Sequence, residues 1–168
     1  MTKKVGFCIN RVSLAASLAL SLSVAIALPA HAGLGGDESS VDSDATALHA
    51  TMVPSTATAS EATTPFSVRS FVTAQGTTVR EYAAHSGPVF GVAWQGHRPP
   101  DLSVLLGSYY SEYTAASGPA GRHANLHHAV IKGPNAVVVM GGHMGRIVGR
   151  AYVPNLAPSD VDAKAVVK

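Results

Sequence analysis

One short segment that is apolar on both of its faces constrains this chain more than any other feature. Residues 89–95 read Val-Phe-Gly-Val-Ala-Trp-Gln and hold the only tryptophan of the protein. Side chains alternate between the two faces of a β-strand, so Phe90, Val92 and Trp94 are expected to share one face, opposite small or aliphatic residues. A strand with no polar face belongs in the middle of a sheet or beneath a helix.

Five further segments have the composition of strands. Val, Ile, Thr and aromatic residues recur in each of them, and Gly, Pro and Asn bound them, as is typical of short strands joined by turns. These segments are residues 67–73, 77–84, 126–132, 136–140 and 145–153. Because the connections are short, neighbouring strands are expected to pair antiparallel, with one of the turns at Gly141-Gly142.

Residues 101–118 have the spacing of one amphipathic helix. Asp101 stands at the N-cap position, where a carboxylate accepts backbone N–H groups. The apolar positions recur every three or four residues: Leu102, Leu105, Leu106, Tyr109 and Tyr113. The fold class is therefore α+β, an antiparallel sheet of about six strands in the order β-β-β-α-β-β-β with one amphipathic helix packed on it. Trp94, Phe90 and Leu105 are expected to be buried together between sheet and helix.

Residues 1–32 have the pattern of a secretory signal peptide. Three basic residues and no acid come before residues 12–28, a run of Val, Leu, Ile and Ala interrupted only by serines. Ala30-His31-Ala32 then supplies the small residues that a signal peptidase recognises. An uncleaved anchor is the alternative, but the apolar run is at the short limit of a membrane span. We expect a periplasmic or secreted protein without a membrane span after cleavage.

The rest of the chain divides by composition. Residues 33–65 contain five acids, no Lys or Arg and no aromatic residue, a composition that favours a disordered leader. Residues 66–153 form the expected single domain, and residues 154–168 a flexible tail. Cys8 is the only cysteine and lies in the signal segment. The mature chain is therefore expected to lack disulfides, thiolate nucleophiles and cysteine-bound zinc.

Four histidines are the candidate metal ligands: His123, His127, His128 and His143. Imidazole nitrogens suit Zn, Cu or Ni. On a strand, however, His127 and His128 point to opposite faces, and His123 lies too far along the chain to share an ion with His127. We expect separate histidines and no metal or other cofactor, with a histidine-based metal-binding protein as the alternative.

Acidic residues are few in the expected domain, which contains Glu81, Asp101 and Glu112. Since Asp101 is assigned to a helix cap, a pair of carboxylates for glycoside hydrolysis is hard to assemble. Glu81 follows Arg80 on a predicted strand, and we expect it to form a solvated cross-strand ion pair.

Nucleophilic catalysis and nucleic-acid binding also lack their usual patterns. Ser86 lies beside His85 but has no G-x-S-x-G elbow around it. The basic residues are scattered singly, whereas a nucleic-acid surface clusters them with aromatic residues. We expect a non-catalytic binding or assembly module of the cell envelope, with an envelope protein or a second copy of the chain as partner. A small hydrolase is the less favoured alternative.

Several short motifs together resemble a family of small exported bacterial proteins, the domain of unknown function 2844. They are the A-x-A site followed by Gly33-Leu34-Gly35-Gly36, T-x-V-R-E-Y at 77–82, G-x-V-F-x-V-A-W at 87–94, P-D-L at 100–102 and G-G-H-M at 141–144. The resemblance implies export and a shared fold. It implies no activity, ligand or catalytic residue.

Cleavage after Ala32 is a testable expectation, because the small residues at Ala30 and Ala32 fit the recognition pockets of a signal peptidase. Intact-mass measurement of the protein recovered from the cell envelope should give a chain that starts at Gly33. Recovery of a membrane-embedded product that retains Met1 would contradict the signal-peptide prediction.

Overall fold

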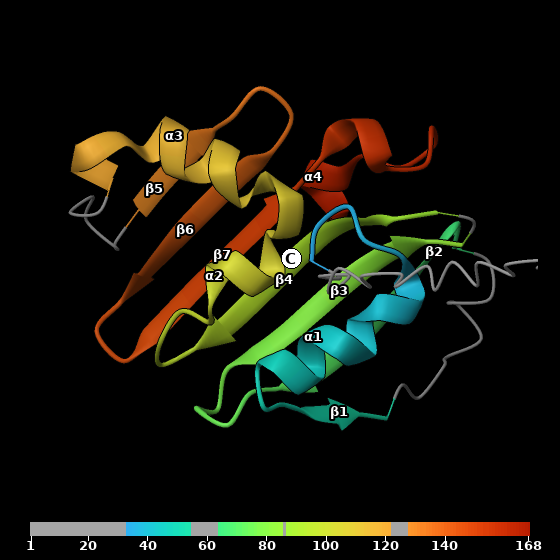
Figure 1. The fold of residues 1–168 in the computed structure, drawn as a ribbon, viewed down its shortest axis with the longest axis horizontal. Helices are drawn as coiled ribbons and strands as arrows, with labels where there is room; N and C mark the ends of the chain where they lie inside the picture. Colours follow the sequence, from blue (N-terminus) through green and yellow to red (C-terminus); the bar gives the residue numbers. More distant parts are fainter. Residues whose placement is uncertain (1–32, 55–63, 86, 122–127) are drawn as a thin grey trace, which may run out of the picture.

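A seven-stranded antiparallel sheet organises the part of the chain that the structure, a computed structural model, describes: residues 33–54, 64–85, 87–121 and 128–168. The strand order is β1-β2-β3-β4-β7-β6-β5 (Figure 1). The strands are β1 Thr51–Val53, β2 Phe66–Val72, β3 Thr78–Ala84, β4 Val89–Gly96, β5 His128–Lys132, β6 Val137–His143 and β7 Arg146–Tyr152. The sequence predicted six of them and their antiparallel pairing, and β1 is the addition.

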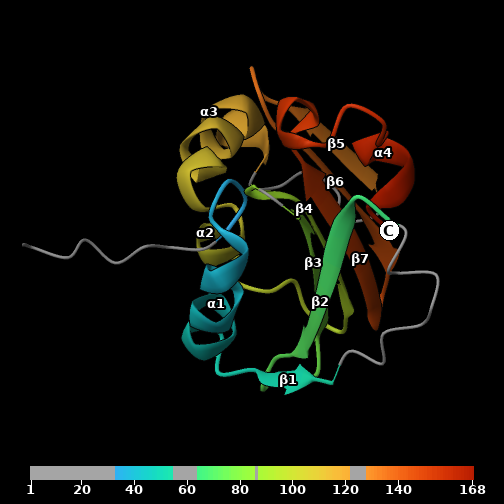
Figure 2. The same ribbon diagram turned by 90° about the vertical axis from the view of Figure 1, so that its right-hand side faces the viewer.

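Short helices cover the two faces of the sheet unequally. They are η1 Glu38–Ser40, α1 Val41–Ala47, α2 Leu102–Leu105, η3 Gly107–Tyr109, α3 Tyr110–Gly121, η4 Pro154–Leu156 and α4 Ala163–Val166. Figure 2 shows α1, α2 and α3 on one side of the sheet and α4 on the other. We call the side under α1, α2 and α3 the covered face, and the side that α4 covers only in part the open face.

The single helix expected over residues 101–118 is divided into α2, η3 and α3. Asp101 is the predicted N-cap, and its Oδ1 accepts from the Ser103 N–H at 2.9 Å. The first segment ends where Gly107 takes a φ of 49°, a left-handed conformation that an α-helix does not contain. Leu105 and Leu106 are buried on the covered face as predicted.

The helical segment between β4 and β5 carries the chain from the centre of the sheet to its far edge. Glu112 on α3 holds the turn between β5 and β6, since its two carboxylate oxygens accept from the Asn135 side chain at 2.8 Å and from the Asn135 backbone N–H at 3.1 Å. The side-chain hydrogen bond from Asn135 lowers the pKa of Glu112 most strongly. This clamp positions the edge strand β5 against α3.

A β-bulge in β4 changes which residues share a face. Tyr82 pairs with Gly91 and Ala83 with Val89, so Phe90 is an extra residue on β4. Phe90 therefore packs on the open face, where the centroid of its ring lies 5.8 Å from that of Phe66. Trp94 and Leu105 share the covered-face core as expected, but the prediction that Phe90 joins them is wrong.

Trp94 is packed between its two neighbouring strands on the covered face. It pairs with Val79 on β3 and with Gly149 on β7. A Cβ atom on Gly149 would lie 2.2 Å from the indole ring, so the ring occupies the space that any larger residue would need. The absence of a side chain at Gly149 thus leaves the space that the Trp94 ring occupies.

The N-terminal segment, which its composition assigned to a disordered leader, forms η1, α1 and β1 within residues 33–54. Leu34 and Val41 are buried in the covered-face core, and the Leu34 N–H donates to the Leu105 carbonyl at 2.8 Å. Val41, Ala45 and Leu48 have helical spacing, which is enough to bury one face of a short helix.

The C-terminal segment also packs on the sheet, although its composition predicted a flexible tail. Val167 is fully buried on the open face, and a Cβ atom on Gly91 would lie 2.2 Å from its side chain. The bulged strand β4 thus presents a glycine where the C-terminal segment approaches its backbone.

The turn between β6 and β7 lies further along the chain than predicted. Gly141 and Gly142 remain in β6, paired with Val148 and Ile147. Met144 and Gly145 make the turn instead, and Gly145 takes the left-handed φ of 85° that this position requires.

The packing of Trp94 on Gly149 predicts a large effect of a small substitution. Gly149→Ala should lower the free energy of unfolding by about 1–3 kcal/mol through overpacking, and Trp94→Ala by about 3–5 kcal/mol through a cavity. Urea denaturation followed by circular dichroism measures both. Gly87→Ala is the matched control, because a Cβ atom there would lie at an ordinary 3.7 Å from Ala84. Equal stability of Gly149→Ala and the wild type would contradict this packing.

Candidate functional site

Two adjoining hollows lie on the open face, and together we call them the open-face groove. The first has a volume of about 330 Å³ and the second about 630 Å³. His128, Val139 and Arg150 line both, so the hollows form one continuous depression over β4, β7, β6 and β5. Volumes of this size are typical of sites for small organic molecules.

The floor of the groove is apolar except for Arg150. Ala93, Arg150, Val139 and Val130 stand opposite one another across β4, β7, β6 and β5, so they form one row across the sheet. Val130 on the edge strand β5 is 49% exposed, and Val148 on β7 is 39% exposed. An exposed apolar surface rimmed by polar residues is typical of a binding site.

The rim of the groove is positively charged. Besides Arg150 in the floor row, the groove lining includes four Lys or Arg side chains: Arg80, Lys132, Lys164 and Lys168. Among the described residues, Asp162 is the one acidic side chain in the lining, and its Oδ1 accepts from the Lys164 N–H at 3.0 Å as the N-cap of α4. A concave surface with one sign of charge and apolar walls concentrates ligands of the opposite charge.

Arg150 connects the groove to α4. One guanidinium nitrogen donates to the Lys164 and Val167 carbonyls, both at 3.1 Å, so it satisfies carbonyls at the end of α4. Tyr82 donates its hydroxyl proton to the Lys168 carbonyl at 2.9 Å. These bonds position the wall of the groove, whereas Arg80 on β3 is solvent-exposed and available to a ligand.

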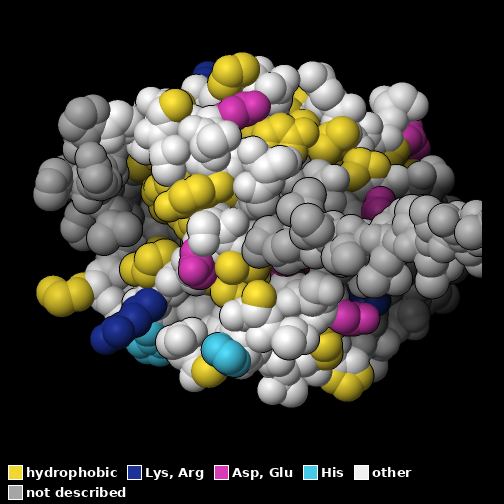
Figure 3. Space-filling view, viewed as in Figure 1, with side chains coloured by type: hydrophobic (Ala, Val, Ile, Leu, Met, Phe, Trp, Pro, Cys, Tyr) yellow, Lys and Arg dark blue, Asp and Glu magenta, His cyan; other side chains and the backbone are white. Residues whose placement is uncertain are grey.

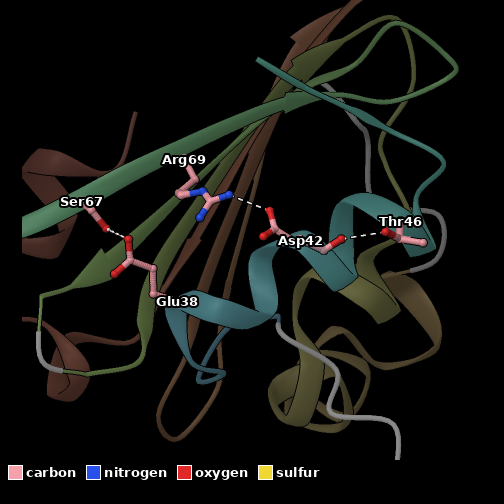
Figure 4. A network of polar contacts seen from close by, with 5 residues as sticks. All are labelled: Glu38, Asp42, Thr46, Ser67 and Arg69. Carbon is pink, nitrogen blue, oxygen red and sulfur yellow. Dashed lines mark hydrogen bonds and ion pairs between the residues drawn. The ribbon is translucent and has the colours of Figure 1, made fainter. Parts of the chain in front are cut away.

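The covered face differs in charge from the groove. In the view of Figure 3, acidic side chains are spread over this face, while Lys and Arg gather mainly at one margin. The acids near β2 are tethered: Arg69 contacts Asp42 at 2.6 Å and Ser67 donates to Glu38 at 2.7 Å (Figure 4).

A second candidate site is a pair of carboxyl groups buried between α1 and β3. Asp44 on α1 and Glu81 on β3 are each 1% exposed. Burial, the charge of Asp44 and a hydrogen bond with Asp44 together raise the pKa of Glu81 from 4.5 to about 8, and Arg69 opposes this rise. Apart from Asp44, no hydrogen-bond donor reaches either Glu81 oxygen within the described residues. The Glu81 carboxyl therefore keeps its proton near neutral pH.

The expectation of a solvated Glu81 is wrong, although the alternation along β3 is as predicted, with Arg80 exposed and Glu81 buried. Val79 and Ala83, two residues to either side, are both core residues, and period-two alternation places Glu81 on the same face. Asp44 likewise lies beside Ala45 within the apolar stripe of α1. These two spacings are the sequence features from which the burial of Glu81 and Asp44 could have been predicted.

Neither acid lines the two hollows, so the pair does not contact a ligand bound there. The described residues near the β3–β4 turn do not support the hydrolase alternative. A ring nitrogen of His85 hydrogen-bonds the Thr64 carbonyl at 2.8 Å. Ser86 lies outside the described residues.

Two of the four candidate histidines, His128 and His143, lie within the described residues. His128 lines the groove, and His143 ends β6 with Nδ1 at 3.2 Å from the Met144 carbonyl. His123 and His127 lie outside the described residues. Within the described ranges, no three His, Cys, Asp or Glu side chains are grouped to hold a metal ion. The absence of a bound metal in the whole protein stays a prediction.

A family model described as "Protein of unknown function (DUF2844)" matches residues 30–166. No curated protein and no solved structure matches the chain. In the part of the chain that the structure describes, none of the helices has the length and apolarity needed to cross a membrane.

The buried pair predicts how stability varies with pH. Because the folded-state pKa of Glu81 is raised from 4.5 to about 8, its contribution is fully present below pH 4.5 and is lost as pH rises to about 8. The free energy of unfolding should fall by up to about 1.4 kcal/mol per pH unit in this window. Urea denaturation at pH 5, 6, 7 and 8 measures this slope, which Glu81→Gln should reduce.

Glu38→Gln is the matched control, since it removes an acid from the same segment but leaves the buried pair intact. The control should keep the wild-type slope. A wild-type stability that is level between pH 5 and 8 would show that Glu81 is ionised without cost in the folded protein.

Proposed function

The chain belongs to the DUF2844 family of proteins of unknown function, and we propose that it is an exported binding module for a small anionic amphiphile. The observation that carries this proposal is the open-face groove, in which an apolar floor lies under a rim of cations. The ligand class is a carboxylate or phosphate attached to an apolar body, and the module performs no chemistry on it.

The apolar body of the ligand matches the floor of the groove. Val130 and Val148 are 49% and 39% exposed, and their burial by a ligand contributes roughly 25 cal/mol of binding free energy per Å² of apolar surface removed from water. A purely polar anion would leave these side chains in contact with water. The floor therefore selects for ligands with an aliphatic or aromatic part.

The anionic group matches the rim. Arg80 is exposed on the strand that borders the smaller hollow, and none of the described residues that line this hollow is acidic. A guanidinium donates two parallel hydrogen bonds to a carboxylate or phosphate. Arg150 adds its charge at the centre of the groove while its donors hold α4.

Export is supported by the signal-peptide pattern of residues 1–32, which lie outside the described residues. A periplasmic or secreted location gives the module access to lipids and organic acids of the cell envelope. A cysteine-free mature chain is consistent with a fold that is held together by its core alone.

Isothermal titration calorimetry with decanoate tests the proposal. Decanoate should bind, whereas decyltrimethylammonium, with the same tail and the opposite charge, and acetate, with the head group alone, should not. Arg80→Gln should raise the dissociation constant about tenfold, as expected for loss of one charge-assisted hydrogen bond. Val148→Asp should abolish binding by placing an anion on the floor.

Arg146→Gln provides the matched control, because it removes the same charge from an exposed position outside the groove. This variant should bind decanoate as the wild type does. Equal affinity for decanoate and decyltrimethylammonium, or a dimer in solution that buries the groove, would contradict the proposal.

A further inference from the structure

Helix α1 is attached to the sheet by a small set of contacts. Three side chains, Val41, Ala45 and Leu48, bury its apolar face. Its ion pair, Asp42 with Arg69, is exposed at 63% and 34% of the two side chains, and such pairs contribute little. Asp44 and Glu81 add a buried polar contact between α1 and β3. The docking of α1 therefore depends strongly on the state of this pair.

The surroundings of Glu81 contain more acids than bases. Arg69 on β2 stands directly opposite Glu81, and Val92 faces it from β4. The segment above contributes the ionisable residues Glu38 from η1 and Asp42 and Asp44 from α1, whereas α2 has no ionisable residue. Of these groups, Asp44 and Arg69 act on the charge of the Glu81 carboxyl, whereas Glu38 is hydrogen-bonded to Ser67 and Asp42 is paired with Arg69.

Arg69 does not compensate for a second buried charge. Its guanidinium is directed to Asp42, which it contacts at 2.6 Å (Figure 4). Within the described residues, Glu81 has no donor other than the Asp44 carboxyl. A buried carboxylate without donors is costly, and two adjacent carboxylates repel each other strongly where water is excluded.

We propose that α1 is a proton-dependent latch, which stays on the covered face while Asp44 and Glu81 share a proton and leaves it when both carboxyls are ionised. Separation of α1 from β3 brings both carboxylates into water, which removes their repulsion. It also uncovers the apolar side chains of β3 and β4 beneath the helix. Binding in the open-face groove is not required for this movement.

The direction of the pH effect follows from linkage. In the closed state the Glu81 pKa is about 8, and in the open state it returns to its ordinary value of 4.5. The equilibrium constant for opening therefore rises up to about tenfold per pH unit between these values and is level above pH 8. The latch is closed in acid and loosens as the medium becomes alkaline.

Amide hydrogen exchange of the full mature chain between pH 5 and 9 tests the latch. The Leu48 and Ala50 amides report on it, since they donate to the carbonyls of Asp44 and Ala45 at 2.9 and 2.7 Å. Their protection factors should fall by up to about tenfold per pH unit to pH 8. Amides of β4 and β7 should stay protected. The double variant Asp44→Asn with Glu81→Gln should show no such fall.

Glu38→Gln is the control, because it weakens a tether of the same segment without changing the buried pair. It should lower protection equally at every pH and keep the wild-type pH dependence. Level protection of Leu48 in the wild type, or loss of protection in β4 and β7 together with α1, would overturn the latch. The same fall in protection in the double variant would also overturn the latch. If the double variant does not fold, the pH dependence of the wild-type protection factors alone tests the proposal.

Discussion

Alternation along β3 separates charge across the sheet, and both candidate sites depend on this separation. Arg80 and Glu81 are neighbours in the chain, yet Arg80 borders the open-face groove and Glu81 is buried beneath α1. Glu81 and Val79 share the covered face, so the carboxyl is enclosed by the same packing that buries the core. One strand therefore contributes a cation to the proposed ligand site and an acid to a helix contact.

The two ends of the chain make the faces unequal. The N-terminal segment places α1 beside α2 and α3, whereas α4 covers only one end of the opposite face (Figures 1 and 2). A sheet of seven strands is wider than one short helix, which leaves the β5, β6 and β7 region of the open face uncovered. The groove is thus a direct result of the small size of α4, which has four residues.

The sequence allowed six strands, their antiparallel pairing and the Asp101 cap to be predicted, because these follow from local patterns. The bulge at Phe90 could not be predicted, since it depends on the register between two strands. Residues 33–65 were predicted to be disordered because of their acidic composition, although the spacing of Val41, Ala45 and Leu48 is helical. Glu81 was predicted to be solvated because acids are rarely buried, although the alternation along β3 places it on the core face. The groove joins residues from five strands and the C-terminal segment, a proximity that only the topology creates.

Mapping of decanoate on the isotope-labelled protein by NMR tests the functional account most directly, at pH 6, where α1 is expected to be closed. The account predicts ligand-dependent shifts of the Ala93, Val139 and Val148 amides, which line the groove, and unchanged amides in α1. Shifts confined to the covered face, or no shifts at a saturating ligand concentration, would contradict it.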